Sequence, residues 1–359
     1  MREIKVTANE AGQRLDKLLS KYMREAPKSF FYKMMRKKNI TLNGKKAQGN
    51  EMLSCGDVVK LFLAEDTILK FQGGGDANGV VKLSGRTGRS GRDVPGRTQG
   101  SDTPEKLHGS GSARKCDMKK QPLDIIYEDD HIVLINKPSG MLSQKAKPQD
   151  ISLVEYLTEH LLENGSITAE QLQLFHPSIC NRLDRNTSGI VVAGKSLIGL
   201  QTMSRLLQDR SMRKYYRCIV KGSMKGSCHL KGYLTKDEKT NTVRISENPG
   251  SSEDKAIETK YTVLASENGL SMLEVHLITG RSHQIRAHLA SIGHPILGDT
   301  KYGDERLNRI YREKYGVRSQ MLHAYRLEFP KMEGTLGYLS ERTFSAEPPE
   351  IYGRVFSKT

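Results

Sequence analysis

The chain has 359 residues, of which 36% are hydrophobic and 27% charged, and this balance excludes a fibrous protein and a wholly disordered one. It contains no apolar run of about 18 residues and no apolar core near its first residues, so neither a membrane span nor a secretion signal is predicted. The 57 Lys and Arg residues outnumber the 41 Asp and Glu residues to give a net charge of +16, which favours a polyanion such as nucleic acid as partner.

The 5 cysteines are odd in number and none is spaced as C-x-x-C, so the sequence predicts neither a disulfide framework nor a structural zinc site. This usage fits a reducing compartment. We therefore expect a cytoplasmic protein, and we take a monomer as the default oligomeric state.

Residues 1–65 predict a small α/β unit with an unusually basic sequence. Helical and alternating spacing of apolar residues predicts two helices and two strands, at residues 15–22, 30–35, 40–42 and 58–62. Ser29 is placed to cap the second helix and Asn39 to end it, and the Asn43-Gly44 pair is typical of a tight hairpin turn. Residues 1–63 hold 14 basic and 6 acidic side chains.

This unit resembles the small RNA-binding module first described in a ribosomal small-subunit protein, which we call the S-four-like module. The resemblance covers residues 12–63 and is carried by Arg14-Leu15-Asp16, by the strand and turn ending in Asn43-Gly44-Lys45, and by Gly56-Asp57. A charge run alone also fits a solvated surface. The resemblance implies instead that a cluster of basic residues binds RNA, namely Arg36, Lys37, Lys38, Lys45 and Lys46.

Residues 66–120 predict a flexible linker rich in Gly and Arg. Eleven of the 44 residues from 71 to 114 are Gly, and the hydrophobic periodicity disappears. Such a stretch cannot bury enough apolar area to offset its conformational entropy. The Arg-Gly repeats fit either a passive tether or a segment that contacts phosphates.

Residues 121–359 predict a mixed α+β domain of catalytic size. Strands are expected around a turn at 125–135 and again at 189–193, 215–220, 257–264 and 272–279, and helices at 196–208 and 282–292. Ser152 and Glu155 form a capping box at the start of a further helix. The chain lacks the glycine motifs of nucleotide-binding folds and shows no repeat period.

Two stretches contain candidate chemistry. In the first, residues 181–189, two arginines flank Asp184 in a polar turn before a buried strand; this fits either a surface loop tied by an ion pair or a carboxylate held ionised for catalysis. In the second, residues 279–303, Arg286 borders an apolar helical stripe formed by Ile285, Leu289 and Ile292. We expect Arg286 to be half sheltered and to need an anionic partner, which any carboxylate could provide.

Residues 123–330 resemble an RluA-type pseudouridine synthase, a family that isomerises uridine in ribosomal RNA. The family motifs H-R-L-D-x-x-T-S-G, K-P-x-G, K-x-Y-x-A-x-V-x-G, T-G-R-x-H-Q-I-R-x-H-L and L-H-A are matched by residues 181–189, 137–140, 214–222, 279–289 and 322–324. Asn181 replaces the first His of the family motif, and residues 141–144 depart from the usual V-x-V-H-P.

The resemblance implies the pseudouridine synthase fold, with a central mixed, mainly antiparallel sheet and flanking helices. It makes Asp184 the catalytic carboxylate, Tyr216 the ring that stacks on the target base, and Arg286 the ion-pair partner of Asp184. It also implies substrate binding by four residues, namely Lys137, Arg182, Arg281 and Leu322. No metal or other cofactor is expected.

The sequence thus predicts an enzyme that converts uridine to pseudouridine, with large-subunit ribosomal RNA as the expected partner. The sequence does not identify which uridine is modified. It fits both a reaction through a covalent aspartyl intermediate and one through a glycal. The main alternative is a non-catalytic RNA-binding or ribosome-assembly protein that keeps this fold. Two others are weaker: a metal hydrolase using His283, His288, His294 and Asp299, whose spacing does not suit one helical face, and a glycosidase with Asp129 or Asp130 as second carboxylate.

Overall fold

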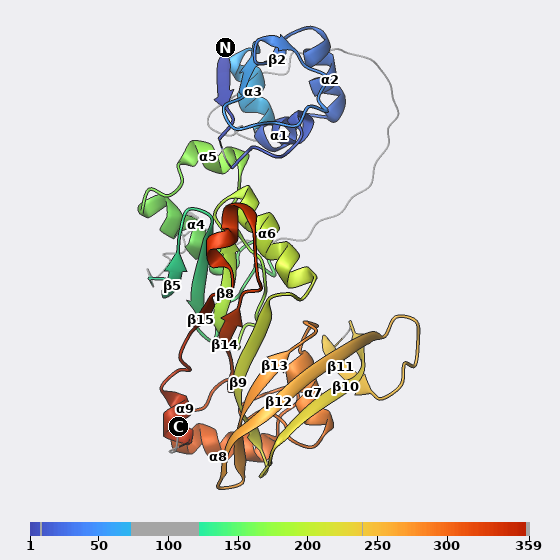
Figure 1. The fold of residues 1–359 in the computed structure, drawn as a ribbon, viewed down its shortest axis with the longest axis vertical. Coiled ribbons are helices and arrows are strands. Elements are labelled where there is room, and N and C mark those ends of the chain that lie inside the picture. Colours follow the sequence, from blue (N-terminus) through green and yellow to red (C-terminus); the bar gives the residue numbers. More distant parts are fainter. Residues whose placement is uncertain (8, 73–121, 239, 357–359) are drawn as a thin grey trace, which may run out of the picture.

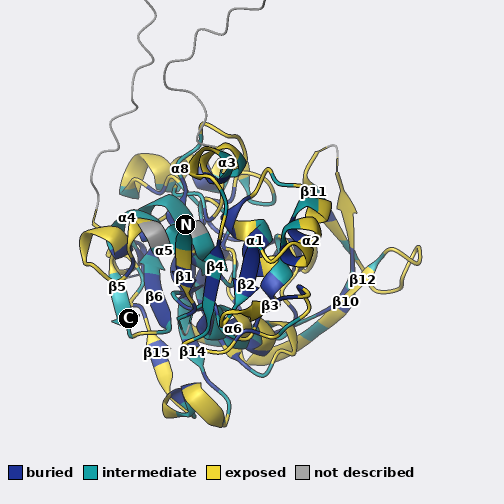
Figure 2. Ribbon diagram, turned by 90° about the horizontal axis from the view of Figure 1, so that it is seen from above, coloured by how far each residue is buried: buried dark blue, intermediate teal, exposed yellow. Residues whose placement is uncertain are grey.

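The computed structural model describes residues 1–7, 9–72, 122–238 and 240–356, which form one small and one large β-sheet (Figure 1). None of the helices in these ranges has the length and hydrophobicity that crossing a bilayer requires. Buried positions concentrate on the strands and exposed ones on the outer sides of the helices and hairpins (Figure 2).

The N-terminal unit is a four-stranded antiparallel sheet packed against helices, with strand order β1-β4-β2-β3. Its elements are β1 (Arg2–Lys5), α1 (Leu15–Tyr22), α2 (Lys28–Arg36), β2 (Ile40–Leu42), β3 (Lys45–Lys46), β4 (Val58–Leu61) and α3 (Glu65–Phe71). The predicted helices and strands are confirmed, and Asn43 and Gly44 both have positive φ in the turn between β2 and β3. Strand β1 was not predicted.

Both predicted ends of α2 were wrong. Pro27 precedes the helix and Ser29 lies inside its first turn, because proline already supplies the fixed φ that begins a helix. At the other end Lys38, with φ 59°, takes the left-handed conformation one residue before Asn39. The N–H groups of Lys38 and Asn39 then donate to the carbonyls of Met35 and Met34.

The boundary of the predicted linker was also wrong at its first residues. Helix α3 occupies residues 65–71; Ile68 is buried in the core of the N-terminal unit, and the Phe71 ring packs on Phe30 with 4.8 Å between centroids. These apolar contacts hold the segment on the unit. The rest of the predicted linker, from residue 73 to residue 120, lies outside the described residues.

The large sheet is mixed and mainly antiparallel, as expected, with strand order β11-β10-β12-β13-β9-β14-β8-β6-β5. Its strands are β5 (Ile125–Glu128), β6 (Ile132–Lys137), β7 (Ser178–Ile179), β8 (Ser188–Gly194), β9 (Arg213–Lys221), β10 (Ser227–Asp237), β11 (Thr242–Ser246), β12 (Lys255–Glu267), β13 (Leu270–Leu277), β14 (Leu322–Glu328) and β15 (Thr343–Ser345). Only the β8–β14 pair among these is parallel.

Helices cover both faces of this sheet. They are α4 (Leu153–Glu163), α5 (Ala169–Leu174), α6 (Leu197–Gln208), α7 (Gln284–Ser291), α8 (Glu305–Tyr315), the 3-10 helix η1 (Gly334–Leu339) and α9 (Ile351–Val355). Apolar residues of α4 and α7 pack on one face, and those of α6 and η1 on the other. Ser152 and Glu155 form the predicted capping box of α4.

The parallel contact between β8 and β14 requires a glycine. Gly189 has φ 107°, and a Cβ atom there would lie 2.3 Å from the carbonyl oxygen of Ala324. Both strands adjoin candidate site residues, because residues 181–187, which we call the Asp184 loop, precede β8 and Leu322 begins β14. The close approach therefore joins two parts of the site that are far apart in the sequence.

His323 on β14 is a buried histidine that predicts acid sensitivity. Its Nε2–H donates to the Ala346 carbonyl at 2.9 Å, so Nδ1 is left to accept from the Ser188 hydroxyl at 2.8 Å. Burial lowers the pKa of His323 to about 4. Since the unfolded chain then binds more protons between about pH 4 and 6.5, the free energy of unfolding falls as pH drops through this window.

We expect this group to remove about 2–3 kcal/mol of stability between pH 7 and about pH 4.5. Urea unfolding of the wild type and His323→Gln at both pH values measures it, with His229→Gln, an exposed histidine, as control. The loss should be smaller in His323→Gln alone. An equal pH dependence in all three proteins would show that His323 is not the sensitive group.

Candidate active site

The main cleft of the described structure has a volume of about 1110 Å³ and a strongly positive wall. Asp184 is the single carboxylate among its lining residues. The lining includes eight basic side chains, namely Lys145, Arg182, Arg185, Arg210, Lys214, Arg281, Arg286 and Lys301. Such a cleft attracts a polyanion and places one negative group within it.

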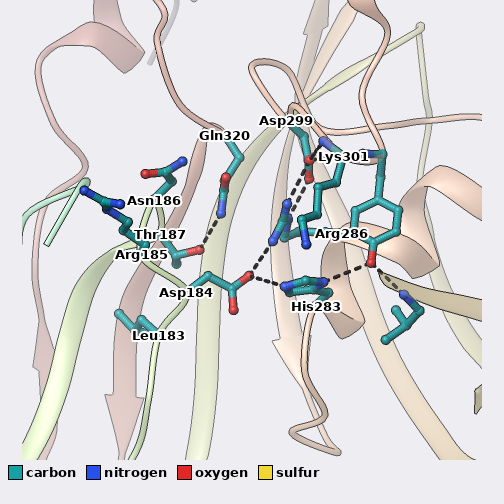
Figure 3. Close-up of polar contacts among 12 residues, drawn as sticks. Leu183, Asp184, Arg185, Asn186, Thr187, His283, Arg286, Asp299, Lys301 and Gln320 are labelled. Atoms are coloured by element: carbon teal, nitrogen blue, oxygen red, sulfur yellow. Dashed lines mark hydrogen bonds and ion pairs between the residues drawn. The ribbon is translucent and has the colours of Figure 1, made fainter. Parts of the chain in front are cut away.

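The Asp184 loop is held from several sides. The Ser143 hydroxyl donates to the Leu183 carbonyl at 2.7 Å and accepts from its N–H at 3.1 Å. The Thr187 N–H donates to the Asp184 carbonyl at 3.0 Å, and the Gln320 amide donates to the Thr187 hydroxyl at 3.1 Å (Figure 3). These bonds close the loop at both sides of the carboxylate, so its position is set by the fold.

Asn181 begins this loop where the family has His. Its Oδ1 accepts the Val192 N–H at 2.7 Å, and its Nδ2 donates to the Ile190 carbonyl at 3.3 Å. An amide suits this double role because it carries both a donor and an acceptor. The replacement therefore keeps the loop attached to β8.

Arg286 links Asp184 to a second carboxylate. Its Nε and Nη2 donate to Asp299 at 2.7 and 2.9 Å, and its Nη1 donates to Asp184 Oδ2 at 2.7 Å (Figure 3). Arg286 is buried rather than half sheltered as expected, since α7 packs under the loop that carries Asp299. The sequence left open whether the anionic partner of Arg286 is the catalytic carboxylate or a structural one. The structure contains both, namely Asp184 and Asp299.

The electrostatics of this triad favour the charged forms. Burial opposes the charge on Arg286, but the hydrogen bonds and attraction of Asp299 and Asp184 outweigh it and raise the Arg286 pKa. Burial likewise opposes the charge on Asp299, whereas Arg286 and the N–H groups of Lys301 and Tyr302 lower the Asp299 pKa. Asp299 therefore fixes the guanidinium, which in turn orients Asp184.

The second oxygen of Asp184 is available to a ligand. Oδ2 is bound by Arg286, whereas Oδ1 has no hydrogen-bond partner among the residues that the structure describes. The side chain keeps 30% of its surface exposed, toward the cleft. One oxygen is thus anchored and the other faces the space where a nucleotide fits.

His283 and Tyr302 complete the polar group, and neither was predicted as part of it. His283 Nε2 lies 3.9 Å from Asp184 Oδ2, and its Nδ1 lies 2.9 Å from the Tyr302 hydroxyl, which accepts the Val243 N–H at 2.8 Å (Figure 3). His283 has φ 53°, a left-handed conformation immediately before α7. Burial lowers the His283 pKa, so the ring is neutral at pH 7.

Tyr216 and Leu322 form the apolar side of the cleft. They lie on the neighbouring strands β9 and β14, and both are buried in the same core cluster. Burial and the nearby charge of Asp184 raise the Tyr216 pKa well above its usual range, so the phenol stays protonated. A planar ring beside Asp184 is suited to stacking on a base.

The predicted binding residues divide into two groups. Arg182 and Arg281 are exposed and line the cleft, so their guanidinium groups can reach a ligand. Lys137 is completely buried and is not among the lining residues, so the structure does not support its predicted contact with substrate. Its ammonium donates to the carbonyls of Pro138, Met141 and Arg185 at 2.9, 3.0 and 3.2 Å and so holds the Asp184 loop from behind.

The predicted RNA-binding cluster lies outside the cleft, at the end of α2 and on the β2–β3 hairpin. All five side chains are exposed, and none has an ion-pair partner among the described residues; they are Arg36, Lys37, Lys38, Lys45 and Lys46. Their charges are thus free to meet an external anion.

The residues of the weaker alternatives have other partners. His288 bonds to the Thr259 hydroxyl at 3.1 Å and His294 to the Lys221 carbonyl at 2.8 Å, so the histidines near Asp299 do not converge. In the described ranges no group of three or more His, Cys, Asp or Glu side chains is placed to hold a metal ion. Asp129 accepts N–H groups in the β5–β6 turn, away from the cleft lining.

Comparisons with known proteins agree with this arrangement. Residues 131–291 match the family model described as RNA pseudouridylate synthase. The chain is 28% identical over 327 residues to ribosomal large subunit pseudouridine synthase C of Vibrio vulnificus, covering 91% of this chain and 87% of the relative. It is 29% identical over 333 residues to the protein of that name from Escherichia coli K12, covering 91% and 88%.

Among solved structures, human RNA pseudouridylate synthase domain containing 4 is similar to this chain with a TM-score of 0.51. The identity is 23%, and the match covers 64% of this chain and 89% of the human chain. At this identity the similarity bears on the fold alone.

Proposed function

We propose that this chain is a member of the RNA pseudouridylate synthase family and isomerises uridine to pseudouridine in large-subunit ribosomal RNA. The observation that carries the proposal is the placement of Asp184. Its carboxylate is anchored by Arg286 at 2.7 Å in a basic cleft beside the buried Tyr216 ring.

The reaction breaks the bond from ribose C1′ to uracil N1 and joins C1′ to uracil C5; C5 loses its proton to water and N1 gains one. Its two chemical routes, attack on the nucleotide and abstraction of a ribose proton, both begin with an ionised carboxylate beside the sugar. Asp184 supplies that group. Tyr216 and Leu322 shelter the detached uracil from water while it turns.

A paired uridine hides its reacting atoms, so the nucleotide must leave its stack at a cost of a few kcal/mol. The cations of the cleft offset this cost by binding phosphates of the surrounding strand. Arg182 and Arg281 are both exposed and line the same cleft as Asp184, which suits them to hold the displaced nucleotide.

Release of tritium tests the proposal directly. An unmodified transcript of large-subunit ribosomal RNA, labelled with tritium at uracil C5, is incubated with the protein, and label released to water is counted. We expect release of one equivalent per modified uridine. A non-catalytic assembly protein would bind the transcript and release no tritium. If tritium is released, mapping of pseudouridines in cells with and without the gene identifies the modified uridine.

The basic cluster of the S-four-like module should contribute to RNA binding through phosphates. Each phosphate contact lowers the slope of log affinity against log salt by about 0.7–0.9. We expect the triple variant Lys37→Ala, Lys38→Ala, Lys45→Ala to bind RNA more weakly and to reduce the magnitude of that slope by about 2–3, measured by filter binding at several salt concentrations.

The matched control for this variant removes three exposed cations of α8, which lies at the opposite end of the molecule (Figure 1). The control residues are Arg309, Arg312 and Lys314. It should keep the wild-type slope. Equal slopes in all three proteins would place the RNA contacts elsewhere.

A further inference from the structure

Lys214 on β9 is a largely buried residue whose ammonium reaches the cleft without a hydrogen-bond partner among the described residues. The residue is 8% exposed and lines the cleft, yet no described side chain or carbonyl accepts a hydrogen bond from its ammonium. Its Nζ lies close to Gly280, at 3.7 Å from the position that a Cβ atom on this glycine would occupy. A charge that is largely removed from water is costly unless it is paired, so this ammonium predicts an anionic ligand in the cleft.

The surroundings of Lys214 are positive. Burial and the charge of Arg210 both lower the Lys214 pKa, and no carboxylate contributes an opposing effect. Arg210 lies in the turn between α6 and β9 and also lines the cleft. On the other side Arg281 follows Gly280 directly and is exposed to the same space. Three cations therefore line this part of the cleft. The nearest acid, Asp209 beside Arg210, accepts the N–H and hydroxyl of Ser211 and does not line the cleft.

The position of this cluster relative to Tyr216 is set by strand geometry. Residues two apart point to the same face of a strand, and their Cα atoms lie about 7 Å apart. Lys214 and Tyr216 therefore face the cleft side by side, as their burial shows. When a base stacks on Tyr216, its sugar and the adjoining phosphate extend along the same wall.

We propose that Lys214 and Arg210, together with Arg281, form a phosphate subsite that holds the RNA backbone next to the nucleotide stacked on Tyr216. The identity of the ligand as RNA rests on the proposed function. In this subsite a phosphate would pair with the Lys214 ammonium, which lies at the wall of the cleft on a largely buried side chain.

The first experiment uses inorganic pyrophosphate as the probe and needs no turnover. We expect Lys214→Met to melt at a higher temperature than the wild type in anion-free buffer, because it removes an unpaired buried charge. Pyrophosphate should raise the melting temperature of the wild type and of Lys331→Met, an exposed control outside the cleft lining, by more than that of Lys214→Met. A lower melting temperature for Lys214→Met, or equal gains in all three, would overturn the proposal.

The second experiment separates a phosphate from a uracil oxygen. RNA binding is measured against salt in the Asp184→Asn background, where no reaction occurs. Loss of one phosphate contact should weaken binding about tenfold in Lys214→Met and reduce the slope by about 0.7–0.9, whereas Lys214→Arg should keep the slope. Weaker binding with an unchanged slope would assign Lys214 to an uncharged oxygen and reject the phosphate subsite.

These outcomes are independent of the catalytic proposal. Failure of tritium release in the wild type would reject the synthase activity and leave both binding results intact. An absent effect of Lys214→Met in a protein that releases tritium would reject the subsite alone.

Discussion

Asp184→Asn should release tritium from uracil C5 on the order of 10⁴-fold more slowly than the wild type, or not at all, while binding RNA with unchanged affinity. Asparagine has the shape of aspartate and its Oδ1 can still accept from Arg286 Nη1. It carries no charge, however, and neither attacks the nucleotide nor takes a ribose proton. The variant thus removes the reactive group and keeps the cleft.

The control for this prediction is Asp129→Asn, which alters the other carboxylate considered at the outset. Asp129 accepts the N–H groups of His131 and Ile132 in a turn, at 2.7 and 2.8 Å, so its loss should leave the single-turnover rate within about twofold. Substantial turnover by Asp184→Asn would disprove the assignment of the catalytic carboxylate. Equal losses in both variants would point to a general effect on folding.

Asp299→Asn should lower both the free energy of unfolding and the catalytic rate. Asp299 is buried and accepts both nitrogens of the Arg286 fork as well as two backbone N–H groups. The asparagine amide has only one acceptor oxygen, and its NH₂ group would face one of the two Arg286 nitrogens that now donate to Asp299. Leaving the buried guanidinium half unpaired costs about 3–5 kcal/mol, measured by urea unfolding.

The catalytic effect of Asp299→Asn should appear in the single-turnover rate, and the affinity for RNA should change little. Arg286 then orients Asp184 less well, and the rate should fall about 100-fold at a temperature where the variant is folded. Asp304→Asn is the matched control: this half-exposed carboxylate pairs with Lys221 and caps α8 at the Leu307 N–H, 2.8 Å away, and asparagine caps as well. A stable, fully active Asp299→Asn protein would contradict the positioning role of Asp299.

The pairing of Asp184 with Arg286 could be predicted because a family motif carries each residue. The roles of Asp299 and His283 could not. Both were considered only as metal ligands, since sequence spacing does not reveal that the Asp299 carboxylate, which follows Gly298 with φ 80°, meets Arg286 of α7. The left-handed conformation of His283, which directs its ring toward Asp184, leaves no periodic signal either.

Burial and exposure explain two further differences between the predicted and the observed structure. Lys137 belongs to a matched motif, yet the sequence does not show that its ammonium points away from the cleft and donates to three backbone carbonyls. Strands β10 and β11 were missed because their residues are largely exposed and polar, so hydrophobic alternation is weak. Their pairing depends on β12, which lies beside them only in the folded sheet.

The contact between Gly189 and Ala324 also bears on how the protein is made. Residues 184 and 286 leave the ribosome well before β14, whose pairing with β8 and β9 brings Leu322 to the cleft. The N-terminal unit has its own core and is synthesised first. A nascent chain therefore completes the separate core of its N-terminal unit before β14 adds Leu322 to the cleft.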